Sequence, residues 1–161
     1  MSGQGSRASG VEGAQGLRLA IVAGEWHALV TDALVDGALR AIEDAGATAD
    51  VVRCPGAFEL PLVAKALAES GYDAVVALGV VIRGGTPHFE YVSSAATDGL
   101  LRAGLDTGVP IGFGVLTCDD DEQARDRSGL PGAREDKGRE AAEAAMATAV
   151  LLRGITGPSG S

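Results

Sequence analysis

A nearly unbroken apolar run, "DAVVALGVVI" at residues 73–82, constrains the fold of this 161-residue chain more than any other stretch. A strand with one face in water alternates apolar and polar residues, whereas a strand covered on both faces is apolar throughout. The run is also too short to cross a membrane as a helix. We therefore expect it to be the central strand of a parallel sheet with helices on both faces.

The rest of the chain alternates strand and helix patterns. Strands are expected at 17–23, 48–54 and 109–117, and helices at 28–45, 55–71, 87–104 and 135–153, with a short helix after the acidic "DDDE" of 119–122. Such alternation predicts right-handed crossovers and an α/β fold, a three-layer α/β/α sandwich. The Gly/Ser-rich ends, 1–16 and 155–161, are expected to be disordered tails of a single domain at 17–154.

Composition excludes several kinds of partner. The formal net charge of −9 argues against a nucleic-acid or anionic-membrane partner, so any bound phosphate needs a local device. Cys54 and Cys118 are too few for a disulfide framework and lack metal-ligand spacing, which predicts free thiols in a reducing compartment. The N-terminus has no apolar signal-peptide region. We expect a cytoplasmic protein.

The end of the central strand has the features of an anion site. Parallel sheets bind ligands outside the carboxyl ends of their strands. There, Gly84 and Gly85 let the backbone approach a ligand closely, because they have no Cβ. Thr86 is expected to be the helix N-cap and Pro87 the first helical residue, which leaves the amides of His88 and Phe89 free for phosphate. A plain strand-to-helix turn is the alternative interpretation.

His88 follows in the first turn of that helix. A neutral imidazole has one donor and one acceptor nitrogen, which suits proton transfer. A histidine that is only packed or capped locally is the alternative. Its position beside the expected phosphate site favours a catalytic role.

Two further strand ends carry candidate ligand contacts. Trp26, the one tryptophan, follows the first strand and suits stacking on a flat ring. Glu59 in "PGAFE" opens a helix and can bind hydroxyls or ring edges; a simple N-terminal helix carboxylate is its alternative. The acidic residues 119–122 are interpreted as helix-start partners, so no metal is predicted. Walker and dinucleotide motifs are absent, so no cofactor is predicted either.

Five stretches, in order over about residues 17–153, resemble the lumazine synthase family: "PGAFELP", "DAVVALGVVIRGGTPHFEYV", "FGVLT", "EQARDRSG" and "DKG". The resemblance implies a flavodoxin-like four-stranded parallel sheet in strand order 2-1-3-4. It also implies that 5-amino-6-(D-ribitylamino)uracil is joined to 3,4-dihydroxy-2-butanone 4-phosphate, the penultimate step of riboflavin biosynthesis, with release of phosphate and water. No cofactor takes part in this reaction.

The resemblance also implies roles for individual residues. Trp26 stacks on the pyrimidine, and His88 moves protons during imine formation, phosphate elimination and ring closure. The remaining implied substrate contacts are Ala57, Phe58 and Glu59 for the ribityl chain, Val80, Val81 and Ile82 for the ring pocket, Gly85 and Thr86 for phosphate, and Phe113, Arg127 and Lys137. Of these, Phe113 and Arg127 come from a neighbouring subunit, which implies a homopentamer with shared sites.

Two departures from the family pattern bear on these expectations. His27 stands where many members carry Asn, and "GLPGARED" (129–136) replaces the shorter, lysine-bearing turn of capsid-forming members. The second departure predicts a pentamer that does not assemble into a capsid. The alternatives are a non-catalytic flavin- or lumazine-binding relative, a flavodoxin-like FMN protein and a structural shell protein. A Ser/Thr-rich phosphate loop after the first strand is lacking, which argues against the FMN protein.

Overall fold

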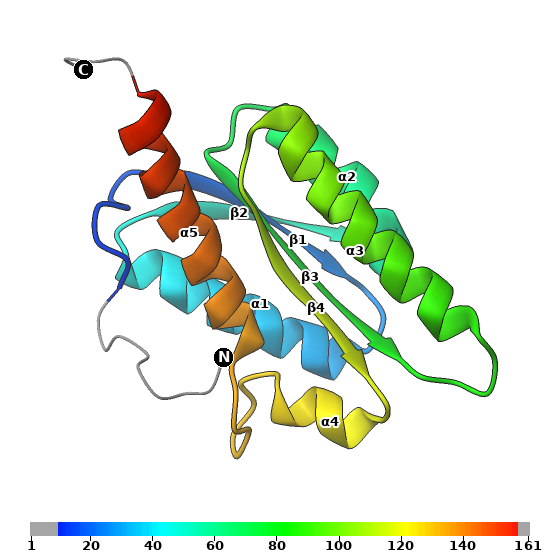
Figure 1. The fold of residues 1–161 in the computed structure, drawn as a ribbon. Helices are drawn as coiled ribbons and strands as arrows, with labels where there is room; N and C mark the ends of the chain where they lie inside the picture. Colours follow the sequence, from blue (N-terminus) through cyan, green and yellow to red (C-terminus); the bar gives the residue numbers. More distant parts are fainter. Residues whose placement is uncertain (1–9, 158–161) are drawn as a thin grey trace.

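A computed structural model describes residues 10–157 and confirms the predicted α/β architecture. Its four parallel strands are β1 (Arg18–Gly24), β2 (Thr48–Cys54), β3 (Ala74–Ile82) and β4 (Ile111–Cys118). They form one sheet in the order β2-β1-β3-β4, as expected (Figure 1). The central pair is β1 and β3, and β4 is an edge strand.

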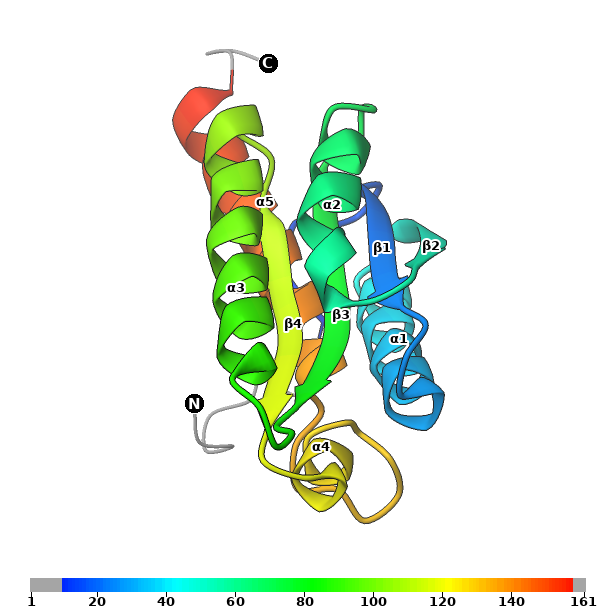
Figure 2. The ribbon, with the colours of Figure 1, turned by 90° about the vertical axis from the view of Figure 1, so that its right-hand side faces the viewer.

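Helices cover both faces of the sheet and make the three layers (Figure 2). One face carries α1 (Ala28–Asp44) and α5 (Lys137–Thr156), which pack against each other. The other carries the short 3-10 helix η1 (Ala57–Glu59), α2 (Leu60–Ala68) and α3 (His88–Thr107). A short α4 (Asp121–Asp126) lies beyond the carboxyl end of β4.

The strand β3 is buried on both faces, as its apolar run predicts. Residues 74–78 are completely inaccessible to solvent. Side chains of Val76, Leu78 and Val80 pack into the cluster under α1 and α5. Val75 and Val81 pack on the opposite side, under α2 and α3. Burial on two faces therefore fixes the position of this strand in the molecule.

The start of α3 differs from the sequence prediction by one residue. Pro87 is the N-cap, with φ −69° and ψ 4°, and His88 is the first helical residue. Thr86 was predicted as the N-cap, and that prediction is wrong. The ψ angle of Pro87 is not yet helical, so the helix starts after it. The hydroxyl of Thr86 instead accepts a 3.5 Å hydrogen bond from the His88 N–H, a local turn contact.

The expected tails are described only in part. Residues 1–9 and 158–161 lie outside the described residues. Ala14 is fully buried in the core under α1 and α5, and α5 continues to Thr156. Cys54 and Cys118 are buried free thiols, as expected. In the described part of the chain, no helix combines the length and hydropathy that crossing a bilayer requires.

The close approach of α5 to α1 depends on the absence of a side chain at Gly138. A Cβ at Gly138 would overlap the backbone of Leu34, whereas Gly154, near the other end of α5, has open space around it. We expect Gly138→Ala to lower the free energy of unfolding by about 1–3 kcal/mol through overpacking. The matched variant Gly154→Ala should raise it by about 0.5–1 kcal/mol, because alanine favours a helix. Urea denaturation of both variants measures the difference. Equal effects would contradict this packing.

Candidate active site

The carboxyl end of β3 extends beyond its neighbour. Ala23 of β1 pairs with Leu78 of β3, and β1 then ends one residue later, at Gly24. Residues 80–82 of β3 still pair with residues 116–118 of β4 but have no β1 partner among the described strand pairs. One side of this backbone is therefore open at the edge where ligands of parallel sheets bind.

An exposed tryptophan lies in the loop after β1, the strand that neighbours β3. The N–H of Glu25 donates 2.9 Å to the carbonyl of Cys54, which joins the loops after β1 and β2. A Cβ at Gly56 would lie only 3.3 Å from Cε3 of Trp26, so the indole rests on the Gly56 backbone. Trp26 and Phe58 are each 65% exposed. Two rings on adjacent loops are therefore available for stacking.

The turn that carries Trp26 has an uncommon backbone. His27 has φ 56° and ψ 52°, the left-handed region, and it is the one non-glycine residue with positive φ among residues 10–157. The buried hydroxyl of Thr31 donates a hydrogen bond to the His27 carbonyl at 3.2 Å. Non-glycine residues in this region are uncommon and tend to occur at functional sites. The hydrogen bond from Thr31, in the first turn of α1, therefore stabilises the turn that carries Trp26.

The loop from Gly84 to Pro87 presents free backbone donors. No described group accepts a hydrogen bond from the N–H of Gly84, Gly85 or Thr86. The Cβ positions of both glycines face open space. His88, exposed at the start of α3, follows directly. The His88 amide, which the sequence predicts to be free, donates to the Thr86 hydroxyl instead. The free amides of Gly85 and Thr86, the phosphate contacts that the resemblance implies, lie in the same exposed turn as His88.

The other three predicted residues lie elsewhere. Phe113 is five residues before the end of β4, about 17 Å along the strand from its carboxyl end, and is 47% exposed. Arg127 follows α4 and donates from Nη1 to the Gln123 carbonyl at 2.9 Å. Lys137 opens α5, and its N–H donates to the Arg127 carbonyl at 2.9 Å. A hydrogen bond to Glu135 raises the pKa of the Lys137 ammonium. Within one chain, the predicted site is divided.

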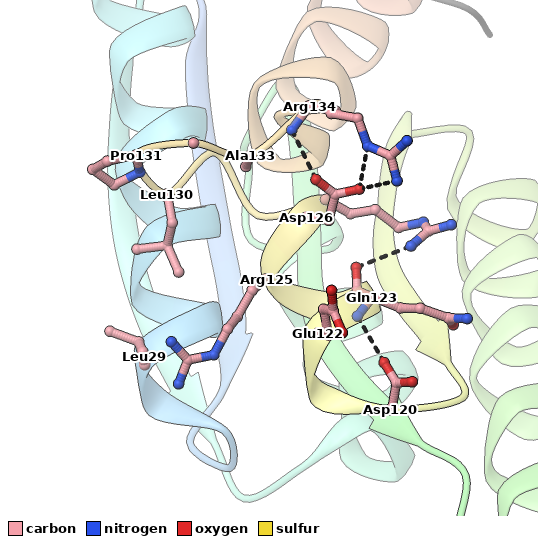
Figure 3. Close-up of a pocket in the computed structure, with 12 residues that line it drawn as sticks. Leu29, Asp120, Glu122, Gln123, Arg125, Asp126, Leu130, Pro131, Ala133 and Arg134 are labelled. Atoms are coloured by element: carbon pink, nitrogen blue, oxygen red, sulfur yellow. Dashed lines mark hydrogen bonds and ion pairs between the residues drawn. The ribbon is translucent and has the colours of Figure 1, made fainter.

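One open pocket of the described structure lies apart from most of the predicted residues. It is an open hollow of about 1030 Å³ between α4, the loop 130–134 and Leu29 (Figure 3). Arg127 lines it, but no other predicted site residue does. Arg134 pairs there with Asp126 at 2.6 Å, so this charge is already matched within the chain. The acidic start of α4 serves the helix itself, because Asp120 accepts from the Gln123 N–H at 2.8 Å.

This fold and its open sheet edge define a flavodoxin-like α/β protein, of the kind that binds small molecules at strand ends. The family model described as 6,7-dimethyl-8-ribityllumazine synthase matches residues 16–153. Curated proteins of that name are 60% identical in Leifsonia xyli subsp. xyli (98% of this chain, 100% of the relative) and 57% identical in Streptomyces coelicolor (98% and 99%). The one in Frankia casuarinae is 62% identical (96% and 98%).

The chain belongs to the 6,7-dimethyl-8-ribityllumazine synthase family. It is an enzyme with lumazine synthase activity, a step of riboflavin biosynthesis. The resemblance found in the sequence is therefore confirmed. Sequence reasoning missed two structural supports of the loops, Gly56 under the indole and Arg83 after β3. Neither has a periodic signal, because each acts through a contact with one particular neighbour.

The contact between Gly56 and the indole yields a prediction. We expect Gly56→Val to displace the Trp26 ring, since even a Cβ lies at the limit of close contact. Trp26 is the one tryptophan in the chain, so its emission spectrum reports its environment alone. The emission maximum should shift in Gly56→Val and stay unchanged in Gly154→Ala. An unchanged spectrum in Gly56→Val would show that the ring does not rest on this backbone.

Proposed function

We propose that the chain condenses 5-amino-6-(D-ribitylamino)uracil with 3,4-dihydroxy-2-butanone 4-phosphate at the open edge of β3. The observation that carries this proposal is that residues 80–82 pair with β4 but have no β1 partner, with the loop 84–88 directly after them and Trp26 in the loop after β1. A flat heterocycle needs hydrogen bonds along its edge and an aromatic surface on its face. A phosphate ester needs backbone donors nearby.

The pyrimidine lies on the Trp26 ring, and its polar edge binds the backbone groups of Val80 and Ile82 that face the β1 side, while Val81 lines the ring pocket. The ribityl chain extends toward Ala57, Phe58 and Glu59, where η1 begins. Glu59 is partly buried, and its carboxylate accepts hydrogen bonds from hydroxyl groups. Ala57 and Leu60 pack close to Gly79 of β3, which keeps this helix start against the strand.

The phosphate binds the N–H groups of Gly85 and Thr86, which have no partner among the described residues. The amine of the pyrimidine attacks the ketone carbonyl, and water leaves as the imine forms. His88 moves the protons that this step, the elimination of phosphate and ring closure require. His88 is exposed on the same turn as the phosphate donors, so it reaches the substrate atoms next to the ester.

A second copy of the chain completes the site. Phe113 lies about 17 Å along β4 from the carboxyl end of the strand, so it serves a neighbour. Arg127 is proposed to serve the same neighbouring site, and Lys137 lies beside it, because the Lys137 N–H donates to the Arg127 carbonyl. Exposed apolar side chains flank the β4 edge: Leu101 and Leu105 on α3, and Leu151 and Ile155 on α5. A surface that contacts a different surface of the next copy closes into a ring, and the family's ring is a homopentamer.

The assembly is expected to stop at the pentamer. The loop 129–136, with Pro131, is longer than the lysine-bearing turn that capsid-forming members use between pentamers. Native mass spectrometry or light scattering measures the particle directly. A particle of many pentamers would contradict the arrest at five subunits, and an active monomer would contradict the shared site.

The activity itself separates this proposal from a non-catalytic lumazine- or flavin-binding protein. Mixing the protein with both substrates should produce the lumazine chromophore and free phosphate together. A binder of the product would change the spectrum of added lumazine but form none from the two substrates.

For the proton-transfer role, we expect His88→Ala to lower kcat by about 10²-fold, the low end of general acid–base contributions. The condensation of an amine with a ketone needs only modest proton help. The residue is exposed, so the thermal midpoint should change little. A folded His88→Ala protein that turns over at the wild-type rate would remove His88 from the mechanism.

For the phosphate role, Arg127→Ala should raise the KM of the phosphorylated substrate by about 10–100-fold. The KM of the pyrimidine should change little, because a bidentate arginine contact is specific for phosphate. Arg127→Lys should restore only part of the loss. Arg125→Ala, two residues earlier and paired with Asp121, is the matched control. Equal losses for both substrates would rule out the assigned role.

A further inference from the structure

Arg83, the first residue after β3, joins three segments through one side chain. Its Nε lies 3.0 Å from Oδ1 of Asp119, which follows β4. Its Nη1 lies 2.8 Å from Oε1 of Glu90, in the first turn of α3. Its Cζ lies 4.4 Å from the centroid of the Phe89 ring. The guanidinium therefore connects the end of one strand, the end of the next and the start of a helix.

The loop that Arg83 spans has little other support. Residues 84–86 donate no backbone hydrogen bonds to described groups, and the Cβ positions of Gly84 and Gly85 face open space. Among the described residues, the Thr86 hydroxyl accepts from the His88 N–H at 3.5 Å, and the Pro87 carbonyl accepts from the Glu90 N–H at 3.1 Å and the Tyr91 N–H at 3.4 Å, so the hydrogen bonds of the loop lie at its α3 end. The backbone of Arg83 is fixed, because its N–H donates 2.8 Å to the Cys118 carbonyl.

Asp119, one of the two carboxylates that pair with Arg83, is itself held by hydrogen bonds. Asp119 accepts from the Gln123 side-chain amide at 3.4 Å, and its N–H donates to Oε1 of Gln123 at 2.7 Å. Gln123 lies in α4, which follows directly. Asp119 thus presents its carboxylate to Arg83 from a held position, and the guanidinium lowers the pKa of that carboxyl.

These contacts make Arg83 a poor phosphate ligand. Its single positive charge is shared by two carboxylates, so the group carries a net negative charge. A phosphate that approached the guanidinium would also meet Asp119 and Glu90. Five donors in a rigid fork, and a flat face that stacks on a ring, suit a three-way brace better than a lysine would.

We propose that Arg83 is a positioning residue that holds the loop 84–87 and His88 in the geometry that the phosphorylated substrate needs. This inference rests on the proposed function of that loop. Arg83 touches no reacting atom. It acts through Glu90 and Phe89, which set the start of α3, and through Asp119, which sets the distance between the ends of β3 and β4.

The first test compares Arg83→Met with Arg102→Met. Arg102 is also an exposed arginine beside a carboxylate, but it lies further along α3, and Asp106 is its one ion-pair partner among residues 10–157. We expect Arg83→Met to raise the KM of the phosphorylated substrate, and the inhibition constant of inorganic phosphate, by about 10–100-fold through misplacement of the loop. The KM of the pyrimidine, the thermal midpoint and the control should stay near wild type. An unchanged phosphate constant, or equal losses for both substrates, would overturn the proposal.

The second test separates a brace from a direct ligand. Asp119→Ala leaves Nε of the Arg83 guanidinium without its carboxylate partner and removes a negative charge. If Arg83 bound phosphate itself, this variant would bind inorganic phosphate more tightly, which would overturn the proposal. A brace predicts weaker binding. It also predicts that Arg83→Met and Asp119→Ala together cost no more than the larger single effect, because both remove one interaction. Arg83→Lys should not restore the constant.

A third variant keeps the two proposals distinguishable. Gly85→Val places a side chain where the phosphate is proposed to bind. If Gly85→Val leaves the phosphate constant unchanged, the loop is not the phosphate site and the proposed function of these residues fails. If Gly85→Val weakens phosphate and Arg83→Met does not, the site stands and the brace alone is wrong.

Discussion

Burial of β3 on both faces is the constraint on which the other features depend. Residues 74–78 exclude solvent completely, so the strand cannot shift along its neighbours without exposing apolar side chains. Because its register with β1 is held, its last three residues extend past the end of that strand. The open backbone edge is therefore a consequence of strand length and register. The loops with Trp26 and His88 adjoin this edge because they follow β1 and β3.

The sheet was predictable because its signals are periodic or continuous. The apolar run of 73–82 and the helical spacing of 28–45 report burial directly, and both elements were found within a residue or so of the expected bounds. The start of α3 differs from the prediction by one residue, because proline fixes φ but leaves ψ free, and the ψ of Pro87 is not yet helical. Arg83 and Asp119 are 36 positions apart, and such a pairing leaves no local pattern. The roles of the site residues stay predictions.

His27 fits the backbone that it occupies. His27 has a left-handed conformation, in which Asn, Asp and His are enriched among non-glycine residues. An exchange of Asn for His therefore keeps the turn while it changes the side chain beside the indole. Thr31 holds the same turn through its buried hydroxyl. The backbone of His27 and its hydrogen bond with Thr31 hold this loop in place. The exposed side chains of the loop, Trp26 among them, are the groups that can contact a ligand.

In the proposed ring, each active site takes its proton-transfer group from one chain and its arginine from the next. Subunits with His88→Ala and subunits with Arg127→Ala, carrying different tags, can be co-expressed and their hybrid rings purified through both tags. If sites are shared, random mixing restores about a quarter of them to the wild-type pair. Activity well above that of either parent variant is the predicted result. Hybrid activity no higher than the mean of the two parents would contradict the shared site.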